Sequence, residues 1–190
     1  MALFTKHQMQ IRTITFITGN AAKAEQLRRH LEHEAFHKKL DLKEIQSVEL
    51  KEIIERKAKD AYEIIKSPVL VEDTSLVFKA LGKLPGPLIK WFLNELGNEG
   101  LCEILDRYKN RAATAEVCFG LYDGKELKTF SGKVEGIISE KPRGKVGFGW
   151  DPIFIPKGSR KTWAEMTPQE QKKTSMRRIA LKKLEAFLKK

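Results

Sequence analysis

The sequence TFITGNAAKAEQL, at residues 15–27, joins a β-branched run to a helical pattern through a short polar turn. The run at 14–18 predicts a strand, and the pattern from Ala22 to about Ala35 predicts a helix. Free backbone N–H groups and the positive helix end meet at such a junction and attract anions. This turn therefore predicts a phosphate site. The alternative is an ordinary helix N-terminus capped by Asn20.

Each residue of this turn has a property that suits a phosphate ligand. Gly19 lets the backbone approach closely, and the side chains of Thr18 and Asn20 can form hydrogen bonds. Lys23, one helical turn later, can add a charge-assisted contact. The stretch matches neither the P-loop nor the three-glycine dinucleotide pattern, so it indicates an anion without naming one.

The chain has the size and composition of one globular domain, which we assign to residues 1–190. It has 190 residues, 41% of them hydrophobic, and no apolar run of the roughly 18 residues that a membrane span needs. We expect a cytoplasmic protein that binds no membrane. Cys102 and Cys118 have neither metal-ligand nor disulfide-framework spacing, which predicts two buried thiols. The net charge of +11 is compatible with any polyanionic partner.

Strand and helix patterns alternate along the chain, which predicts an α/β fold. Helical spacing recurs at 49–66, 88–96, 100–108 and in the lysine-rich C-terminal segment. A short, wholly apolar run at 69–71 predicts a buried strand beside the first one. Alternating residues from Ala113 to Leu121, followed by Asp123-Gly124, predict a hairpin whose second strand continues through Ile138.

The sequence VLVEDTSLVF, at residues 69–78, places two carboxylates after the predicted buried strand. Ligands bind at the C-terminal edge of strands in open α/β sheets. Glu72 and Asp73 would be costly to desolvate there without a cation, and such hard oxygen ligands suit Mg²⁺. Asp73 would orient or deprotonate a water molecule. An exposed turn that caps the next segment is the alternative interpretation.

The sequence GFGWDPIFIP, at residues 147–156, places two aromatic residues on either side of a glycine. Phe148 and Trp150 would clamp a flat base by stacking, and Asp151 would accept a hydrogen bond from a ring N–H. The alternative is a turn in the core that leads into a strand at 153–155.

Six stretches taken together resemble the inosine triphosphate pyrophosphatase family, whose members act on unusual purine nucleoside triphosphates. The resemblance extends from about Ile14 to Leu184. Its motifs are TGNAAK, DLKE with Glu44, LVEDTSL, LPGPLIKW, FGWDPIF, and TWAEMTPQEQ followed by SMRR.

This resemblance implies an elongated, two-lobed α/β fold in which helices flank a central mixed β-sheet and the active-site cleft lies between the lobes. The implied reaction is Mg²⁺-dependent hydrolysis of ITP, dITP or XTP to the monophosphate and pyrophosphate, which cleanses the nucleotide pool. The implied assembly is a homodimer. Trp91 and Phe92, in PLIKWFL, cannot both face the core of a short helix, so one is expected to meet a partner.

The resemblance also assigns roles to individual residues. Glu44, Glu72 and Asp73 would surround the metal ion, with Asp73 activating the attacking water and Glu72 sharing the catalytic site. The residues that would bind substrate are Thr18, Gly19, Asn20, Lys23 and Lys57 at the phosphates, and Phe148, Trp150, Asp151, Ser175 and Arg177 at the base.

Two positions depart from the family pattern. Gln171 stands where the family has a lysine and Met176 where it has a histidine. Lys172 would have to replace the lysine from a neighbouring position, roughly 100° away around a helix. A thioether donates no hydrogen bond, so Met176 predicts a narrower preference for 6-oxo purines.

Two alternatives to this function stay open. One is a pyrophosphatase that cleanses the nucleotide pool with an altered base preference. The other is a non-catalytic nucleic-acid-binding protein on the same scaffold. Three carboxylates at the site would not help a protein that binds a polyanion, and the aromatic residues do not follow a basic stripe. We therefore expect a nucleoside triphosphate as the ligand and no nucleic acid.

Overall fold

The structure, a computed structural model, describes residues 13–19, 24, 27 and 35–189. Within these residues, seven strands form one mixed sheet in the order β2-β1-β3-β5-β6-β7, with β4 paired to β3. The first three strands along this order are parallel, and all other pairs are antiparallel. The strands are β1 (Ile14–Ile17), β2 (Ala35–Lys38), β3 (Val69–Phe78), β4 (Pro85–Gly86), β5 (Ala112–Tyr122), β6 (Leu127–Ile138) and β7 (Phe154–Pro156).

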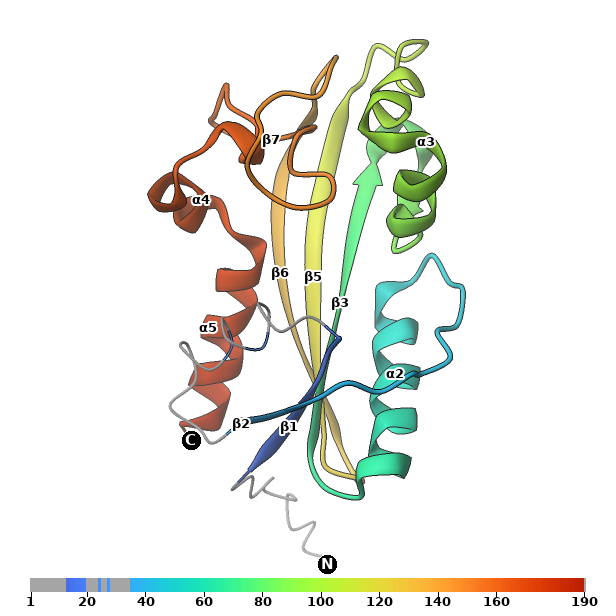
Figure 1. The fold of residues 1–190 in the computed structure, drawn as a ribbon, viewed down its shortest axis with the longest axis vertical. Coiled ribbons are helices and arrows are strands. Elements are labelled where there is room, and N and C mark those ends of the chain that lie inside the picture. Colours follow the sequence, from blue (N-terminus) through green and yellow to red (C-terminus); the bar gives the residue numbers. More distant parts are fainter. Residues whose placement is uncertain (1–12, 20–23, 25–26, 28–34, 190) are drawn as a thin grey trace, which may run out of the picture.

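Helices cover both faces of the sheet (Figure 1). Strands β3, β5 and β6 run along the length of the molecule, with α5 packed on one face and α2 on the other. The described helices are α2 (Leu50–Ile65), α3 (Ile89–Glu103), α4 (Pro168–Thr174) and α5 (Met176–Leu188), with short 3₁₀ helices at Lys79–Leu81 and Trp163–Glu165. The predicted α/β class and the mixed sheet between helices are confirmed. The division of this domain into two lobes stays a prediction.

Side-chain alternation along β3 separates two hydrophobic cores. Leu70 packs on the face covered by α5, together with Ala180 and Leu184. Val69 and Val71 pack on the opposite face, against Ile54, Ala58 and Ala61 of α2. Burial of both faces explains why VLV is wholly apolar. The same alternation fixes the direction of the polar residues that follow.

A third core lies at the end of the sheet near α3 and β7. Its largest members include four aromatic side chains, Phe78, Trp150, Phe154 and Trp163. The ring centroids of Phe154 and Trp163 are 4.6 Å apart, and those of Trp150 and Trp163 are 5.4 Å apart. This aromatic cluster anchors the segment that follows β6.

The prediction that the third strand ends at Val71 is wrong. Strand β3 continues for seven more residues to Phe78, because β5 pairs with it at every position from Val69 to Phe78. Glu72 and Asp73 therefore lie inside a strand and not after its end. The parallel neighbour, however, stops early: β1 pairs with β3 only at Val69 and Leu70.

Other boundaries were predicted with mixed success. The hairpin at Asp123-Gly124 is confirmed, as is the free, buried state of Cys102 and Cys118. The prediction that the first helix reaches about Ala35 is wrong, because Ala35 begins β2 and pairs with Ile14 of β1. Most of that predicted helix lies outside the described residues, although Ala24 and Leu27 are helical and buried. No helix in the described ranges has the length and apolarity needed to cross a membrane.

Candidate active site

A cleft opens where one edge of β3 is uncovered. Strand β1 pairs with this edge at Val69 and Leu70, and β4 pairs with it at Leu76 and Val77, so no described strand covers residues 71–75 between them. The cleft has a volume of about 1070 Å³, which is large enough for a small-molecule ligand. Motifs from separate parts of the sequence meet here, since Thr18, Asp73, Trp150 and Arg177 all line the cleft.

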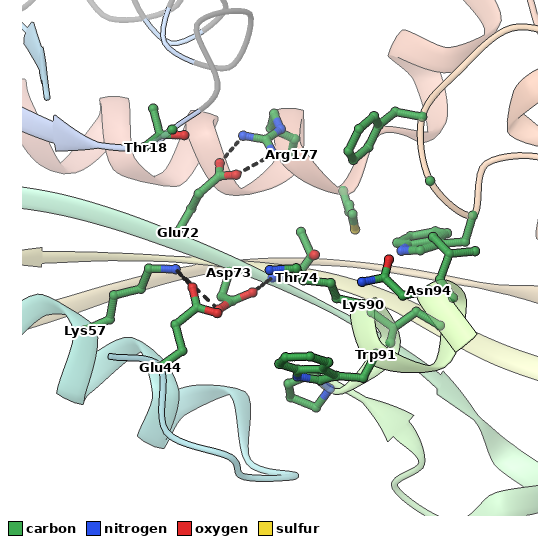
Figure 2. Close-up of a pocket in the computed structure, with 18 of the residues that line it drawn as sticks. Thr18, Glu44, Lys57, Glu72, Asp73, Thr74, Lys90, Trp91, Asn94 and Arg177 are labelled. Carbon is green, nitrogen blue, oxygen red and sulfur yellow. Dashed lines mark hydrogen bonds and ion pairs between the residues drawn. The ribbon is translucent and has the colours of Figure 1, made fainter. Parts of the chain in front are cut away.

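Glu72 and Asp73 reach the cleft from opposite faces of the sheet (Figure 2). Successive side chains of a strand alternate, so Glu72 follows Leu70 toward α5 while Asp73 follows Val71 toward α2. Their cross-strand neighbours agree, because Glu72 pairs with Phe119 and Asp73 with Cys118. The two carboxylates are adjacent in sequence but have separate partners.

Glu72 forms a two-pronged ion pair with Arg177 in the first turn of α5. Arg177 Nη1 donates to Glu72 Oε2, and Nη2 donates to Oε1 at 2.8 Å. The Glu72 side chain is only 4% exposed. The Arg177 guanidinium also lies 5.7 Å from the centre of the Phe119 ring. Arg177, predicted to approach a base, is thus engaged by a carboxylate on the sheet.

Asp73 and Glu44 share the ammonium group of Lys57 from α2. Lys57 Nζ donates to Glu44 Oε1 at 2.8 Å and lies 3.6 Å from Asp73 Oδ2. The backbone N–H of Thr74 donates to Asp73 Oδ1 at 2.7 Å. The side chains of Lys57 and Asp73 are mostly buried, at 17% and 24% exposure, whereas that of Glu44 is more open.

Burial and charge set the pKa values of this group in different directions. Burial raises the pKa of Asp73, and the Lys57 charge and the Thr74 N–H only partly oppose it. Burial acts in the same sense on Glu44, but the Lys57 hydrogen bond and charge, with help from Lys90, leave the pKa of Glu44 lowered. The more buried acid is therefore the better proton acceptor of the two.

Across the cleft, the loop at 147–151 presents one exposed aromatic ring. Phe148 is 77% exposed, whereas Trp150 is 8% exposed and packs into the aromatic cluster. Both line the cleft. Asp151 Oδ2 accepts a hydrogen bond from the Phe148 N–H at 2.8 Å. Burial raises the pKa of Asp151, and this hydrogen bond opposes the rise.

The C-terminal signature contributes Gln171, Ser175 and Met176 to the wall of the cleft. Gln171 Nε2 donates to the Trp163 carbonyl at 2.7 Å, which leaves its second N–H and its Oε1 for other partners. The Ser175 hydroxyl accepts from the Arg178 N–H and so caps α5. Lys172 is exposed and does not line the cleft.

The phosphate-binding turn is only partly described. Thr18 and Gly19, which follow β1, both line the cleft, whereas Asn20 and Lys23 lie outside the described residues. Five residues of α3 line the cleft although none of them was predicted from the sequence to belong to the site: Ile89, Lys90, Trp91, Leu93 and Asn94. The motif LPGPLIKW, at residues 84–91, contains the first three of them, whereas no motif of the resemblance includes Leu93 or Asn94.

The carboxylates suit a divalent cation in part. No group of three or more His, Cys, Asp or Glu side chains in the described ranges is placed to hold a metal ion. Glu44 and Asp73 nevertheless converge on one cation, the Lys57 ammonium, which marks a position where two hard oxygen donors meet. Such donors fit Mg²⁺, which takes one or two carboxylates together with substrate phosphates and waters.

Fold and cleft together define an α/β protein with a mixed sheet and a polar, ligand-sized cleft at an interrupted sheet edge. The chain belongs to the Ham1 family, whose sequence model matches residues 14–187. It is 45% identical over 177 residues to inosine triphosphate pyrophosphatase 2 of Trypanosoma cruzi (strain CL Brener), covering 91% of this chain and 90% of that protein.

Solved structures with the same fold include two that match nearly the whole chain. A HAM1 protein from Coxiella burnetii matches with a TM-score of 0.85 and 26% identity, covering 94% of this chain and 99% of the other. A nucleoside-triphosphatase, or dITP/XTP pyrophosphatase, from Mycobacterium abscessus ATCC 19977 matches with a TM-score of 0.77 and 26% identity, covering 90% and 98%.

Proposed function

We propose that this protein hydrolyses ITP, dITP and XTP to the nucleoside monophosphate and pyrophosphate in a Mg²⁺-dependent reaction. Family membership and 45% identity to an inosine triphosphate pyrophosphatase support the substrate class. The observation that carries the proposal is the arrangement of the cleft: the Glu44–Lys57–Asp73 group lines it together with the exposed Phe148 ring. A nucleoside triphosphate needs charged groups for its phosphates and an aromatic surface for its base in the same cleft.

In this proposal, Asp73 removes the proton from the attacking water. The water oxygen bonds to the α-phosphorus, the α–β P–O bond breaks, and pyrophosphate leaves with the electron pair. The raised pKa of Asp73 suits a group that must hold this proton. Lys57, Lys90 and Thr18 hold the phosphates, while Phe148 stacks on the base and Asp151 accepts a ring N–H.

Glu44 and Asp73 are the residues that would hold Mg²⁺, with Glu72 on the other face of the strand. The bound ion would polarise phosphoryl oxygens and neutralise developing charge. Lys57 lies between the two carboxylates, so it would contribute its charge to the same phosphates.

An altered base preference is a second candidate function. One N–H of the Gln171 amide is used by the Trp163 carbonyl, Met176 has no donor, and the Arg177 guanidinium is engaged by Glu72. The side chains that would favour a 6-oxo group through hydrogen-bond donation are therefore few at this end of the cleft. We expect a preference for ITP and XTP over ATP that is modest, because one net hydrogen bond changes affinity by about two- to twelve-fold.

Product analysis tests the reaction and the base preference together. The purified protein is incubated with Mg²⁺ and ITP, XTP, GTP or ATP, and the products are separated by ion-exchange chromatography. We expect IMP and pyrophosphate from ITP, with the highest kcat/KM for ITP or XTP. Release of orthophosphate with IDP would overturn the reaction type. A higher kcat/KM for ATP would overturn the base preference alone.

We also propose a homodimer that acts in the cytoplasm. Trp91 on α3 is 53% exposed and lines the cleft, whereas its neighbour Phe92 packs against the core near α3. The assembly is therefore proposed from membership of the family. Light scattering at micromolar protein concentration should give twice the mass of the 190-residue chain. A monomeric mass would contradict the assembly without affecting the proposed reaction.

A further inference from the structure

Helix α3 contains a break that separates two helical segments. Gly97 adopts φ 67° and ψ −176°, which is not helical, so Asn98 begins the second segment. The positive φ is open to glycine at little cost. The Asn98 side chain turns away from its own helix, and its Nδ2 donates to the Gly149 carbonyl at 3.0 Å across 51 residues of sequence.

Gly149 is the central residue of the loop that carries the proposed base contacts. It lies between Phe148 and Trp150 and has φ 63°. The loop's other hydrogen bonds are local or reach the segment after β7: Phe148 N–H donates to Asp151, Ile153 N–H donates to the Trp150 carbonyl, and Ala164 N–H donates to the Asp151 carbonyl. Among the described residues, the Asn98 bond is the hydrogen bond that joins α3 to this loop.

Packing reinforces the same junction. A Cβ atom at Gly149 would lie 3.7 Å from Leu93 Cδ2, so the loop backbone already rests against α3. Asn98 itself does not line the cleft. Its amide therefore acts on a ligand indirectly, and the loop is the part of the cleft wall to which it is hydrogen-bonded.

The other atom of the Asn98 amide has no partner. Asn98 Oδ1 is the one buried side-chain nitrogen or oxygen atom of the described residues without a hydrogen bond. A buried, unpaired acceptor destabilises a folded protein, and an apolar residue of similar shape would avoid that cost. Asparagine at this position is thus a poor choice for stability, and its benefit lies in the donor that holds Gly149.

We infer that Asn98 is a positioning residue that fixes the loop at 147–151 for binding the base. The inference rests on the proposed function, because that function gives the loop its ligand. By holding the Gly149 carbonyl, Asn98 sets the direction of the peptide groups on either side and hence the placement of Phe148 and Asp151. Loss of this bond would weaken contacts to the base and leave contacts to the phosphates in place.

Two substitutions separate the donor from the shape of the side chain. Asn98→Leu removes the donor and the unpaired acceptor together, and Asn98→Asp keeps the shape but replaces the donor with an acceptor that faces the Gly149 carbonyl. Glu95→Gln is the matched control, an exposed position on the same helix that does not line the cleft. Calorimetry measures the Kd of IMP and of pyrophosphate separately, with steady-state kinetics on ITP and the Tm in parallel.

For Asn98→Leu, we expect the Kd of IMP and the KM for ITP to rise about two- to twelve-fold, the range for one hydrogen bond. The Kd of pyrophosphate should stay unchanged and the Tm should not fall. Asn98→Asp should weaken IMP binding at least as much. Amide hydrogen exchange at 147–151 should be faster in both variants than in the parent protein and in Glu95→Gln.

Unchanged IMP binding and loop exchange in both variants would overturn the inference. Equal weakening of IMP and pyrophosphate together with a lower Tm would also overturn it, since this result would assign Asn98 a purely structural role. Failure of the parent protein to release pyrophosphate from ITP would instead overturn the proposed function, and the exchange measurement would still test the loop contact.

Discussion

Asp73→Asn is expected to lower kcat for ITP by about 10²–10⁴-fold, the usual contribution of a general base. The asparagine is nearly isosteric, and its side-chain oxygen can still accept the Thr74 N–H that Asp73 Oδ1 accepts at 2.7 Å. It cannot take a proton from water. Since the pKa of Asp73 is raised mainly by burial, removing its charge also relieves desolvation while it deprives Lys57 of one partner. The fold should therefore survive.

Glu44→Gln is the matched control for this prediction. It removes the charge of the other carboxylate that contacts Lys57, at 2.8 Å, from a more exposed position. Glu44 is proposed to hold Mg²⁺ without taking the proton, so its loss should raise the Mg²⁺ concentration needed for half-maximal activity and spare most of kcat at saturating Mg²⁺. Both variants are compared in kcat across a Mg²⁺ titration, with circular dichroism to verify folding. Near-parental kcat for the Asp73 variant at saturating Mg²⁺ would show that another group activates the water.

The sequence predicted the residues of the site better than their relation to one another. Glu72 and Asp73 interrupt an apolar run, and acidic residues are uncommon in strands, so the local pattern favours VLV as the complete strand. Pairing with β5 over ten positions overrides that local preference. Because β3 extends through both residues, the alternation of side chains along the strand places the two carboxylates on opposite faces of the sheet. Their adjacency in the sequence suggests instead that they act together.

Contacts between distant segments were the least predictable part of the cleft. The sequence does not distinguish Phe148 from Trp150, since both are aromatic residues of one loop. In the structure, Trp150 is buried because it packs against Phe154 and Trp163, whereas Phe148 is exposed. Lys90 and Asn94 line the cleft because α3 packs beside the same loop. No local pattern within α3 indicates that the loop at 147–151 lies beside it.

Arg177→Leu is expected to destabilise the protein by about 3–5 kcal/mol, the usual cost of removing one partner from a buried ion pair. The change leaves a carboxylate whose side chain is 4% exposed beside the Phe119 ring, without its guanidinium. For a chain of this length, each kcal/mol corresponds to about 2–4 °C, so the Tm should fall by about 6–20 °C. Arg178→Leu is the adjacent control: this exposed arginine makes a 3.3 Å hydrogen bond to the Lys172 carbonyl, and its loss should change the Tm little.

The double variant Glu72→Leu/Arg177→Leu separates stability from catalysis. Replacing both members of a buried ion pair with apolar side chains is often neutral or stabilising, and the surrounding core on this face of β3 includes Leu70 and Phe119. The Tm should therefore recover most of what the single variant loses. Activity toward ITP should not recover, because Glu72 is proposed to act at the catalytic site.

A Tm change below about 2 °C in Arg177→Leu would show that the pair adds little to stability. Recovery of activity in the double variant would remove Glu72 from the proposed catalytic residues.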